Sequence, residues 1–138
     1  MKYRFLPHTA DLKIRVYGKN LNEIINNSLL SLISFMKPKF KKDKIFSFNI
    51  SVKGFDYQGA LINFLSEVLA KTYIKKVIFI KFLPSKISKH KDNQVVIKGK
   101  IKGYKFESLK KDIKAITYHQ VVLKQIKVNL IFEFIVDI

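Results

Sequence analysis

Two segments of the chain carry apolar side chains at helical spacing, and most of the remainder alternates between apolar and polar residues. The first helix is expected to begin at Asn20, a good N-cap, with Glu23 three residues later as its capping-box partner. The second is expected to begin after Asp56, another strong N-cap. The predicted buried stripes are Leu21, Ile24, Ile25, Leu29, Leu32, Ile33 and Met36 in the first helix and Leu61, Phe64, Leu65, Val68 and Leu69 in the second. Each helix therefore has an apolar face that a sheet must cover.

The alternating segments predict about six or seven strands. The clean alternation from Leu12 to Tyr17 is typical of a half-buried strand, and Gly18 closes it. Strands are expected at 3–5, 12–17, 45–52, 77–82, 94–102, 113–123 and 128–136, with a loop from Gly103 to Asp112. Two amphipathic helices with these strands predict an α+β two-layer sandwich. Both helices would pack on one face of a mixed, largely antiparallel sheet.

With 138 residues, no internal repeat and no linker, the chain is expected to form one domain, residues 1–138. It has no cysteine, which excludes disulfides, thiolate metal ligands and thiol catalysis and fits an intracellular protein. Its first residues are too polar for a signal peptide, and no apolar stretch approaches the roughly 18 residues that span a bilayer. We expect a soluble, cytoplasmic protein.

The formal net charge is +17 and comes almost entirely from lysine, because Arg4 and Arg15 are the only arginines. Such a charge is typical of proteins that bind nucleic acid. An AT-rich coding sequence also produces this mixture of Lys, Ile, Asn and Phe. Moreover, the lysines are dense only from Lys37 to Lys44 and from Lys110 to Lys114. Weak contact with RNA or tRNA through the basic surface is expected at low salt in either case.

Acidic groups occupy the two ends of the chain. Asp137 follows the apolar run from Ile131 to Val136, and Ile138 after it brings the α-carboxylate. Asp11 adds a third oxygen donor if the first and last strands lie close together. Clustered carboxylates repel one another unless a proton or a cation lies between them, so the pattern predicts a site for a hard divalent cation.

The chain contains three histidines. His90 lies in a lysine-rich loop and is interpreted as a solvated bystander. His8 lies near Asp11 in the sequence and His119 follows Thr117-Tyr118, so a metal or acid–base site is one interpretation, and ordinary backbone hydrogen bonding is the other. Histidine ligands would suit zinc, whereas carboxylate and backbone oxygens would suit calcium or magnesium. The sequence has no nucleophile elbow, Walker loop or dinucleotide-binding glycine loop.

Several of these pieces, in this order, resemble the archease family, and the resemblance covers essentially the whole chain. The motifs that carry it are His8-Thr9-Ala10-Asp11, the helix from Asn20, the second helix through Asp56, Leu61, Leu65, Glu67 and Leu69, the pair Gly99 and Gly103, the segment Lys114-Ala115-Ile116-Thr117-Tyr118-His119, and the final Asp137-Ile138. Each piece alone is a weak signal, but together and in order they are specific.

The resemblance implies an accessory protein rather than an enzyme. Archeases assist the GTP-dependent RNA ligase that joins tRNA exon halves, by promoting guanylylation of the ligase and its multiple turnover. The resemblance also implies a metal site, usually described with calcium, with ligands on Asp11, Asp137 and Ile138; magnesium or manganese would suit the same oxygens. The residues expected to orient these ligands or to contact the ligase are His8, Thr9, Lys114, Thr117, Tyr118 and His119.

The chain departs from the family pattern at a few positions. Phe64 replaces the usual tryptophan, Ser66 the usual asparagine, and a tyrosine replaces the glutamate that usually follows Gly103. None of these removes a proposed ligand. Two other functions stay open: an RNA or tRNA-processing chaperone that binds RNA or modulates a tRNA methyltransferase, and a metallohydrolase that uses His8 or His119 as a base.

Overall fold

The computed structural model describes residues 1–8 and 10–138 and contains two helices and seven strands in this part of the chain. In chain order the elements are β1 (Tyr3–His8), β2 (Asp11–Gly18), α1 (Leu21–Met36), β3 (Pro38–Gly54), α2 (Tyr57–Lys75), β4 (Val77–Lys89), β5 (Val95–Leu109), β6 (Ala115–Ile126) and β7 (Asn129–Asp137).

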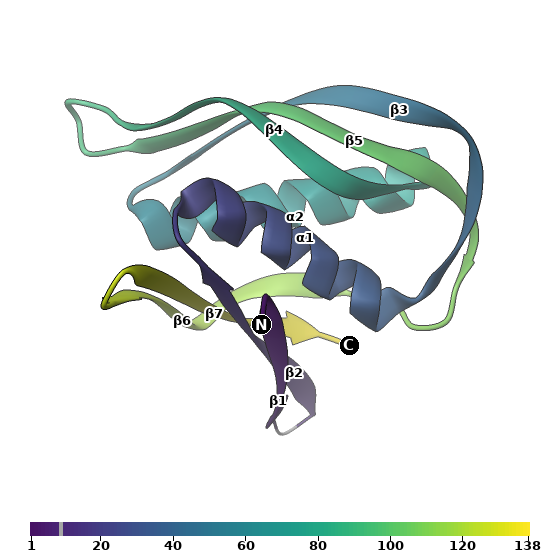
Figure 1. Cartoon of the computed structure of the whole chain (residues 1–138), viewed down its shortest axis with the longest axis horizontal. Helices are drawn as coiled ribbons and strands as arrows, with labels where there is room; N and C mark the ends of the chain where they lie inside the picture. The colour runs from purple at the N-terminus through teal and green to yellow at the C-terminus, as the bar shows by residue number, and fades with distance from the viewer. Residues whose placement is uncertain (9) are drawn as a thin grey trace.

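The two helices lie between two antiparallel sheets (Figure 1). One sheet has the strand order β1-β2-β7-β6 and the other has the order β3-β5-β4. The expected α+β sandwich of two helices and antiparallel strands is therefore confirmed, with the refinement that the strands divide between two sheets. The helices contact both sheets, because their apolar surface is wider than one stripe. On α2 the consecutive residues Ala60, Leu61 and Ile62 are all buried, which a helix covered on one side does not allow.

Both helices begin where the sequence predicts. The side chain of Asn20 accepts a hydrogen bond from the backbone N–H of Glu23 at 2.9 Å, and Asp56 accepts one from Gly59 at 2.7 Å. Lys37 ends α1 in the left-handed conformation just before the proline that starts β3. The sequence was sufficient to predict these N-caps, because a capping hydrogen bond joins residues that are close together in the chain.

The β3-β5-β4 sheet is longer than the sequence predicts. Gly103 was expected to end a strand, but β5 continues through it to Leu109. The glycine is needed for packing, because a Cβ at this position would overlap the backbone carbonyl of Ile78 on β4. Pro84 lies within β4, where it is tolerated because β4 is an edge strand.

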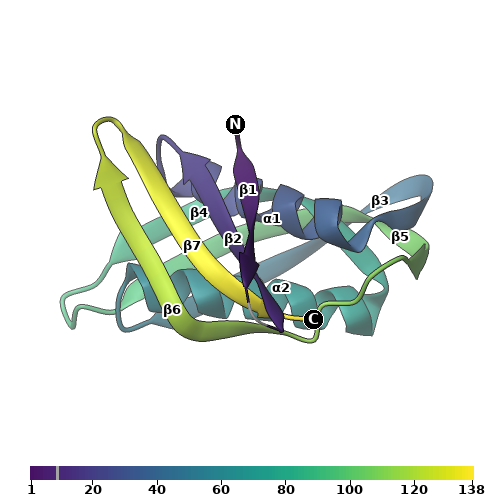
Figure 2. The ribbon, with the colours of Figure 1, turned by 90° about the horizontal axis from the view of Figure 1, so that it is seen from below.

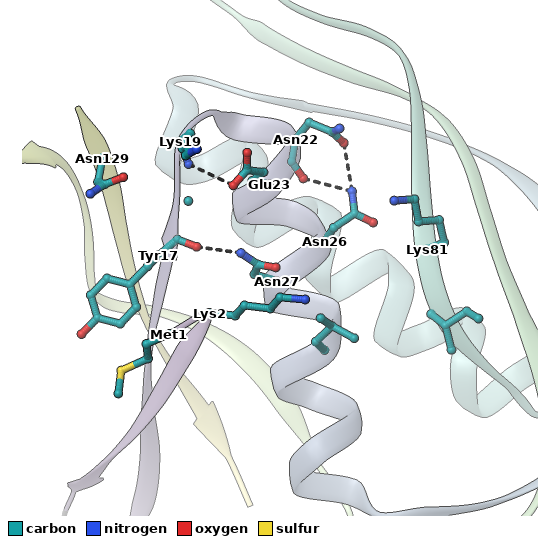
Figure 3. A pocket seen from close by; sticks show the side chains of 13 residues that line it. Met1, Lys2, Tyr17, Lys19, Asn22, Glu23, Asn26, Asn27, Lys81 and Asn129 are labelled. Carbon is teal, nitrogen blue, oxygen red and sulfur yellow. Dashed lines mark hydrogen bonds between the residues drawn. The ribbon is translucent and has the colours of Figure 1, made fainter.

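Helix α1 covers part of the free edge of β4. The side-chain amide of Asn26 donates to the carbonyl of Phe82 at 3.2 Å, and its oxygen accepts from the Phe82 N–H at 2.9 Å. One side chain thus replaces the two hydrogen bonds that a neighbouring strand would make. On the other side of α1, Asn27 donates to the carbonyl of Tyr17 at 2.7 Å (Figure 3). These two amides connect α1 to both sheets.

The central pair of the four-stranded sheet is β2 and β7. Ile14 of β2 is the partner of Phe134, and both side chains are completely buried. On the opposite face Arg15 is the partner of Glu133, and its Nε donates to the carboxylate at 2.5 Å. This hydrogen bond is the main reason that the pKa of Arg15 is raised above its ordinary value. The register of β2 on β7 is therefore set on both faces of the sheet.

None of the helices described is both long and apolar enough to cross a membrane.

Replacing Gly103 with alanine is expected to destabilise the protein by about 1–3 kcal/mol, because the new methyl group meets backbone that cannot rotate away. Urea unfolding of the wild type and the variant measures this. Gly59→Ala is the matched control, because Gly59 lies in the first turn of α2, where a Cβ would approach the Asp56 carboxylate at 3.1 Å and the Cα of Gly54 at an ordinary 4.0 Å. This variant should change the free energy of unfolding by less than about 1 kcal/mol. Equal midpoints for Gly103→Ala and the wild type would contradict the packing argument.

Candidate functional site: an acidic tip at the ends of β2 and β7

The first residue of β2 and the last residue of β7 are neighbours. Leu12 is the partner of Val136, so the same antiparallel register places Asp11 next to Asp137. Asp137 is also the partner of Ala115 on β6, and its carbonyl accepts the N–H of Lys114 at 2.7 Å. We call Asp11, Asp137 and Ile138 the acidic tip. Figure 2 shows the C-terminus at this end of the sheet, beside the start of β2.

The tip is accessible to solvent. Asp11 is half-buried, Asp137 is exposed, and Ile138 is 41% exposed. Adjacent carboxylates and main-chain oxygens are hard donors, which is the donor chemistry that calcium, magnesium and manganese prefer. Within residues 1–8 and 10–138, no group of three His, Cys, Asp or Glu side chains lies together as a metal cluster. A cation at the tip would therefore need an oxygen of Ile138 in addition to the two aspartates.

The other candidate residues near the start of β2 are only partly described. The backbone of His8 is the partner of Asp11 in the β1–β2 pair. The side chain of His8 and the whole of Thr9 lie outside the described residues, so their expected roles stay predictions. Ala10, between them and Asp11, has a positive φ of 61°.

The segment from Lys114 to His119 is only partly at the tip. Lys114 is exposed and adjoins Asp137, whereas Thr117 is paired with Ile135 further along β7. After Thr117, β6 leaves its register with β7 and regains it at Val122. His119 lies in this irregular stretch, is exposed, and its backbone N–H donates to the Thr117 hydroxyl at 3.3 Å. Because β7 separates β6 from β2, the structure does not bring His119 beside the first strands.

Two contacts with α2 hold this segment in place, and sequence reasoning missed both. The hydroxyl of Tyr73 accepts the backbone N–H of Ile113 at 3.1 Å and donates to the carboxylate of Asp112 at 3.2 Å. The hydroxyl of Tyr118 is hydrogen-bonded to the side-chain oxygen of Asn63. Only a polar side chain on an otherwise apolar helix face could have indicated these contacts, and that signal does not identify a partner some forty or more residues away.

The largest of the clefts described lies elsewhere. It has a volume of about 820 Å³ and is located over the first turns of α1, at the opposite end of β2 from the acidic tip (Figure 3). Its polar lining includes Asn22, Asn26 and Asn27 from α1 and Lys81 from β4. Asn26 donates to both the carbonyl and the side chain of Asn22. None of the metal-ligand or partner-contact candidates named from the sequence lines this cleft.

The fold and the tip together define a class of protein: a small α+β sandwich in which the second and the last strands pair through the core, so that the carboxylates at the start of β2 and the end of β7 are adjacent. The sequence profile of the Archease protein family matches residues 3–138. The chain belongs to the archease family.

Proteins named archease from several archaea are similar to this chain over nearly its full length. The one from Pyrococcus furiosus is 34% identical over 129 residues, which cover 91% of this chain and 89% of the relative. The one from Sulfurisphaera tokodaii is 29% identical over 141 residues, which cover 99% of each chain.

Two solved structures share the fold. The solution structure of Methanobacterium thermoautotrophicum protein 1598 covers 99% of this chain and 98% of its own, with a TM-score of 0.76 and 21% identity. The crystal structure of an archease from Thermotoga maritima, described as a possible chaperone, covers 96% of this chain and 94% of its own, with a TM-score of 0.65 and 16% identity.

Replacing Tyr73 with phenylalanine is expected to lower the free energy of unfolding by about 1 kcal/mol, because the N–H of Ile113 loses its acceptor. Partial burial raises the pKa of the Tyr73 phenol above its ordinary value. The neutral phenol is therefore favoured in the folded state, and its contribution is present below about pH 10 and lost as the pH rises through the folded pKa.

Urea unfolding of both proteins at about pH 8 and above about pH 11 measures this difference. The difference in the free energy of unfolding between the wild type and Tyr73→Phe should become smaller at high pH. If the two proteins are equally stable near neutral pH, or if their difference in stability grows in alkali, the Tyr73 hydroxyl does not stabilise the fold as the acceptor of the Ile113 N–H.

Proposed function

We propose that this chain is a non-enzymatic activator of the GTP-dependent RNA ligase that joins tRNA exon halves. Membership of the archease family supports the proposal, and the observation that carries it is the β2–β7 register that brings Asp11 next to Asp137. In this proposal the protein acts in the cytoplasm, promotes guanylylation of the ligase and returns the ligase to a form that can turn over repeatedly.

Asp11, Asp137 and an oxygen of Ile138 would hold a divalent cation at the acidic tip. Calcium fits these donors, and magnesium or manganese would use the same oxygens. When bound, such a cation supplies positive charge that can neutralise phosphate oxygens in a nucleotide-binding active site. The chain itself would hold the cation in a fixed position. Because the tip lies at the end of two paired strands and is open to solvent, it can be presented to another protein without unfolding any element.

Lys114 is a candidate for contact with the ligase whose side chain is described and whose backbone adjoins the tip. Its side chain is exposed, and its backbone N–H is fixed to the carbonyl of Asp137. A lysine in this position can approach an acidic or phosphate-bearing partner surface without displacing the strands. Tyr118, which is 64% exposed, and His119 would extend the contact along β6.

The second candidate function is an RNA or tRNA-processing chaperone that binds RNA or modulates a tRNA methyltransferase. The net charge of +17 favours it. RNA affinity that survives about 150 mM salt would support this candidate, because non-specific phosphate contacts weaken steeply with salt.

A multiple-turnover assay of the ligase with and without this protein tests the first proposal. Asp11→Asn and Asp137→Asn keep the shape of the side chain and remove one charge at the tip, and each should lower the activation of turnover at least about tenfold. Deletion of Ile138 should have a similar effect, because it moves the terminal carboxylate by one residue, onto Asp137.

Asp92→Asn is the matched control. It removes the same charge in the turn between β4 and β5, where the side chain of Asp92 accepts the Gln94 N–H and an asparagine oxygen can do the same. This variant should activate the ligase as well as the wild type does. Full activation by Asp11→Asn and Asp137→Asn would contradict the role of the tip.

A further inference from the structure

The outer surface of the β3-β5-β4 sheet carries a regular array of lysines. Residues that are direct partners in an antiparallel pair point to the same face, so the register defines three rows across the sheet. The rows are Ser47–Lys102–Lys81, Asn49–Lys100–Leu83 and Ser51–Lys98–Lys86. We call Lys81, Lys86, Lys98, Lys100 and Lys102 the lysine face. The alternate residues of β5, Ile97 and Ile101, are buried against the helices, so Lys98, Lys100 and Lys102 face outward. Lys81 lies on the edge strand β4 and also borders the cleft beside α1.

The lysine face is not neutralised by the protein itself. Lys81 is the direct partner of Lys102, and Lys86 is the direct partner of Lys98, although like charges directly opposite each other destabilise a sheet. None of the ion pairs identified in the described part of the chain involves these lysines. The sequence has no Asp or Glu within residues 44–55, 68–91 or 93–106, which include the strand segments that form the rows. The surface therefore keeps a positive potential that an external anion would relieve.

The remaining side chains on this face are mainly short and polar. A hollow of about 370 Å³ is lined by Asn49, Ser51, Ser85 and Lys98 together with the backbone of Ile50 and Gly99. Phe82 and Phe48 point the other way: Phe82 is completely buried, and Phe48 is half-buried against Phe79. Tyr104 lies beyond the rows, two residues after Lys102 on β5, where its ring contacts Phe40 and the Lys42 ammonium. The three rows thus offer cations, hydroxyls and an amide, but no aromatic side chain for stacking on bases.

We propose that the lysine face binds the sugar–phosphate backbone of RNA. Lys98, Lys100 and Lys102 are two residues apart on one strand, a repeat of about 6.6–6.8 Å, which is comparable with the distance between successive phosphates of an extended RNA strand. The serine and asparagine side chains beside these lysines, on β3, can hydrogen-bond phosphate and 2′-hydroxyl oxygens. Because no aromatic side chain lies within the three rows, binding there is expected to be tolerant of sequence.

RNA fits this face better than an acidic protein does. Stable protein interfaces are built around buried aromatic or aliphatic anchors, and Leu83 is the one large apolar side chain in the three rows. The face also lies on the opposite side of the helix layer from the sheet that carries the acidic tip (Figure 1). RNA binding here is separate from the activation of the ligase and does not depend on a metal at the tip.

Fluorescence anisotropy with a labelled single-stranded oligoribonucleotide of mixed sequence tests the proposal. The triple variant Lys98→Gln, Lys100→Gln, Lys102→Gln should bind at least about tenfold more weakly at about 100 mM salt. The slope of log affinity against log salt should fall in magnitude by about two, as expected for the loss of three contacts with single-stranded phosphates. The fold should survive, because the substitutions relieve repulsion between lysines that are direct partners.

The matched control is Lys110→Gln, Lys124→Gln, Lys127→Gln, which removes the same charge from exposed positions outside the face. It should weaken binding less than about threefold. Equal losses from the two triple variants would overturn the proposal, since affinity would then follow net charge alone. Unchanged RNA affinity of the lysine-face variant would also overturn it. If that variant instead lost affinity for the ligase, the face would be a protein-binding surface.

The single variant Lys100→Gln keeps the test decisive if the triple variant does not fold. Lys100 is exposed in the middle row between Asn49 and Leu83, so its replacement disturbs no lysine pair. It should reduce the magnitude of the slope of log RNA affinity against log salt by a little less than one, and it should leave the midpoint of urea unfolding unchanged. An unchanged slope would count against the proposal.

Discussion

Antiparallel pairing between β2 and β7 is the constraint on which the rest of the structure depends. The register runs from Leu12 and Val136 at one end to Gly18 and Leu130 at the other. A slip of one residue would turn the buried faces outward and bring Arg15 and its glutamate partner into the core, so the hydrophobic pattern fixes the register. The proximity of the acidic groups at the two ends of the chain is therefore a consequence of core packing, and it would persist whether or not a cation is bound.

The two sheets offer two chemically different surfaces. The β1-β2-β7-β6 sheet ends in the acidic tip, where hard oxygen donors collect at an exposed strand end. The β3-β5-β4 sheet presents lysines that are direct partners across β4 and β5, within segments (68–91 and 93–106) that contain no Asp or Glu. The helices between the sheets contact both of them and keep the surfaces apart. A partner held at the acidic tip would therefore not overlap with one held on the lysine face.

The sequence predicted the features that depend on local or periodic signals. Asn20 and Asp56 cap the helices as expected, and the motif order identified the family. It did not predict that the strands divide into two sheets, nor that Gly103 lies inside a strand, because both depend on packing between distant segments. The alternation that places lysines outward on β5 is visible in the sequence, but their pairing with Lys81 on β4 needs the register. The contact of Tyr73 with the segment before β6 likewise has no sequence signature.

Paramagnetic broadening of backbone amide signals by Mn²⁺ tests the central claim most directly, because Mn²⁺ prefers the same oxygen donors and its effect falls steeply with distance. The account predicts that low concentrations of Mn²⁺ broaden the signals of Asp11, Lys114, Asp137 and Ile138 first and leave those at the Gly18 end of β2 sharp, and that an excess of Ca²⁺ restores them. Broadening centred elsewhere, or an equal effect in Asp11→Asn, would contradict a cation site built from the two ends of the chain.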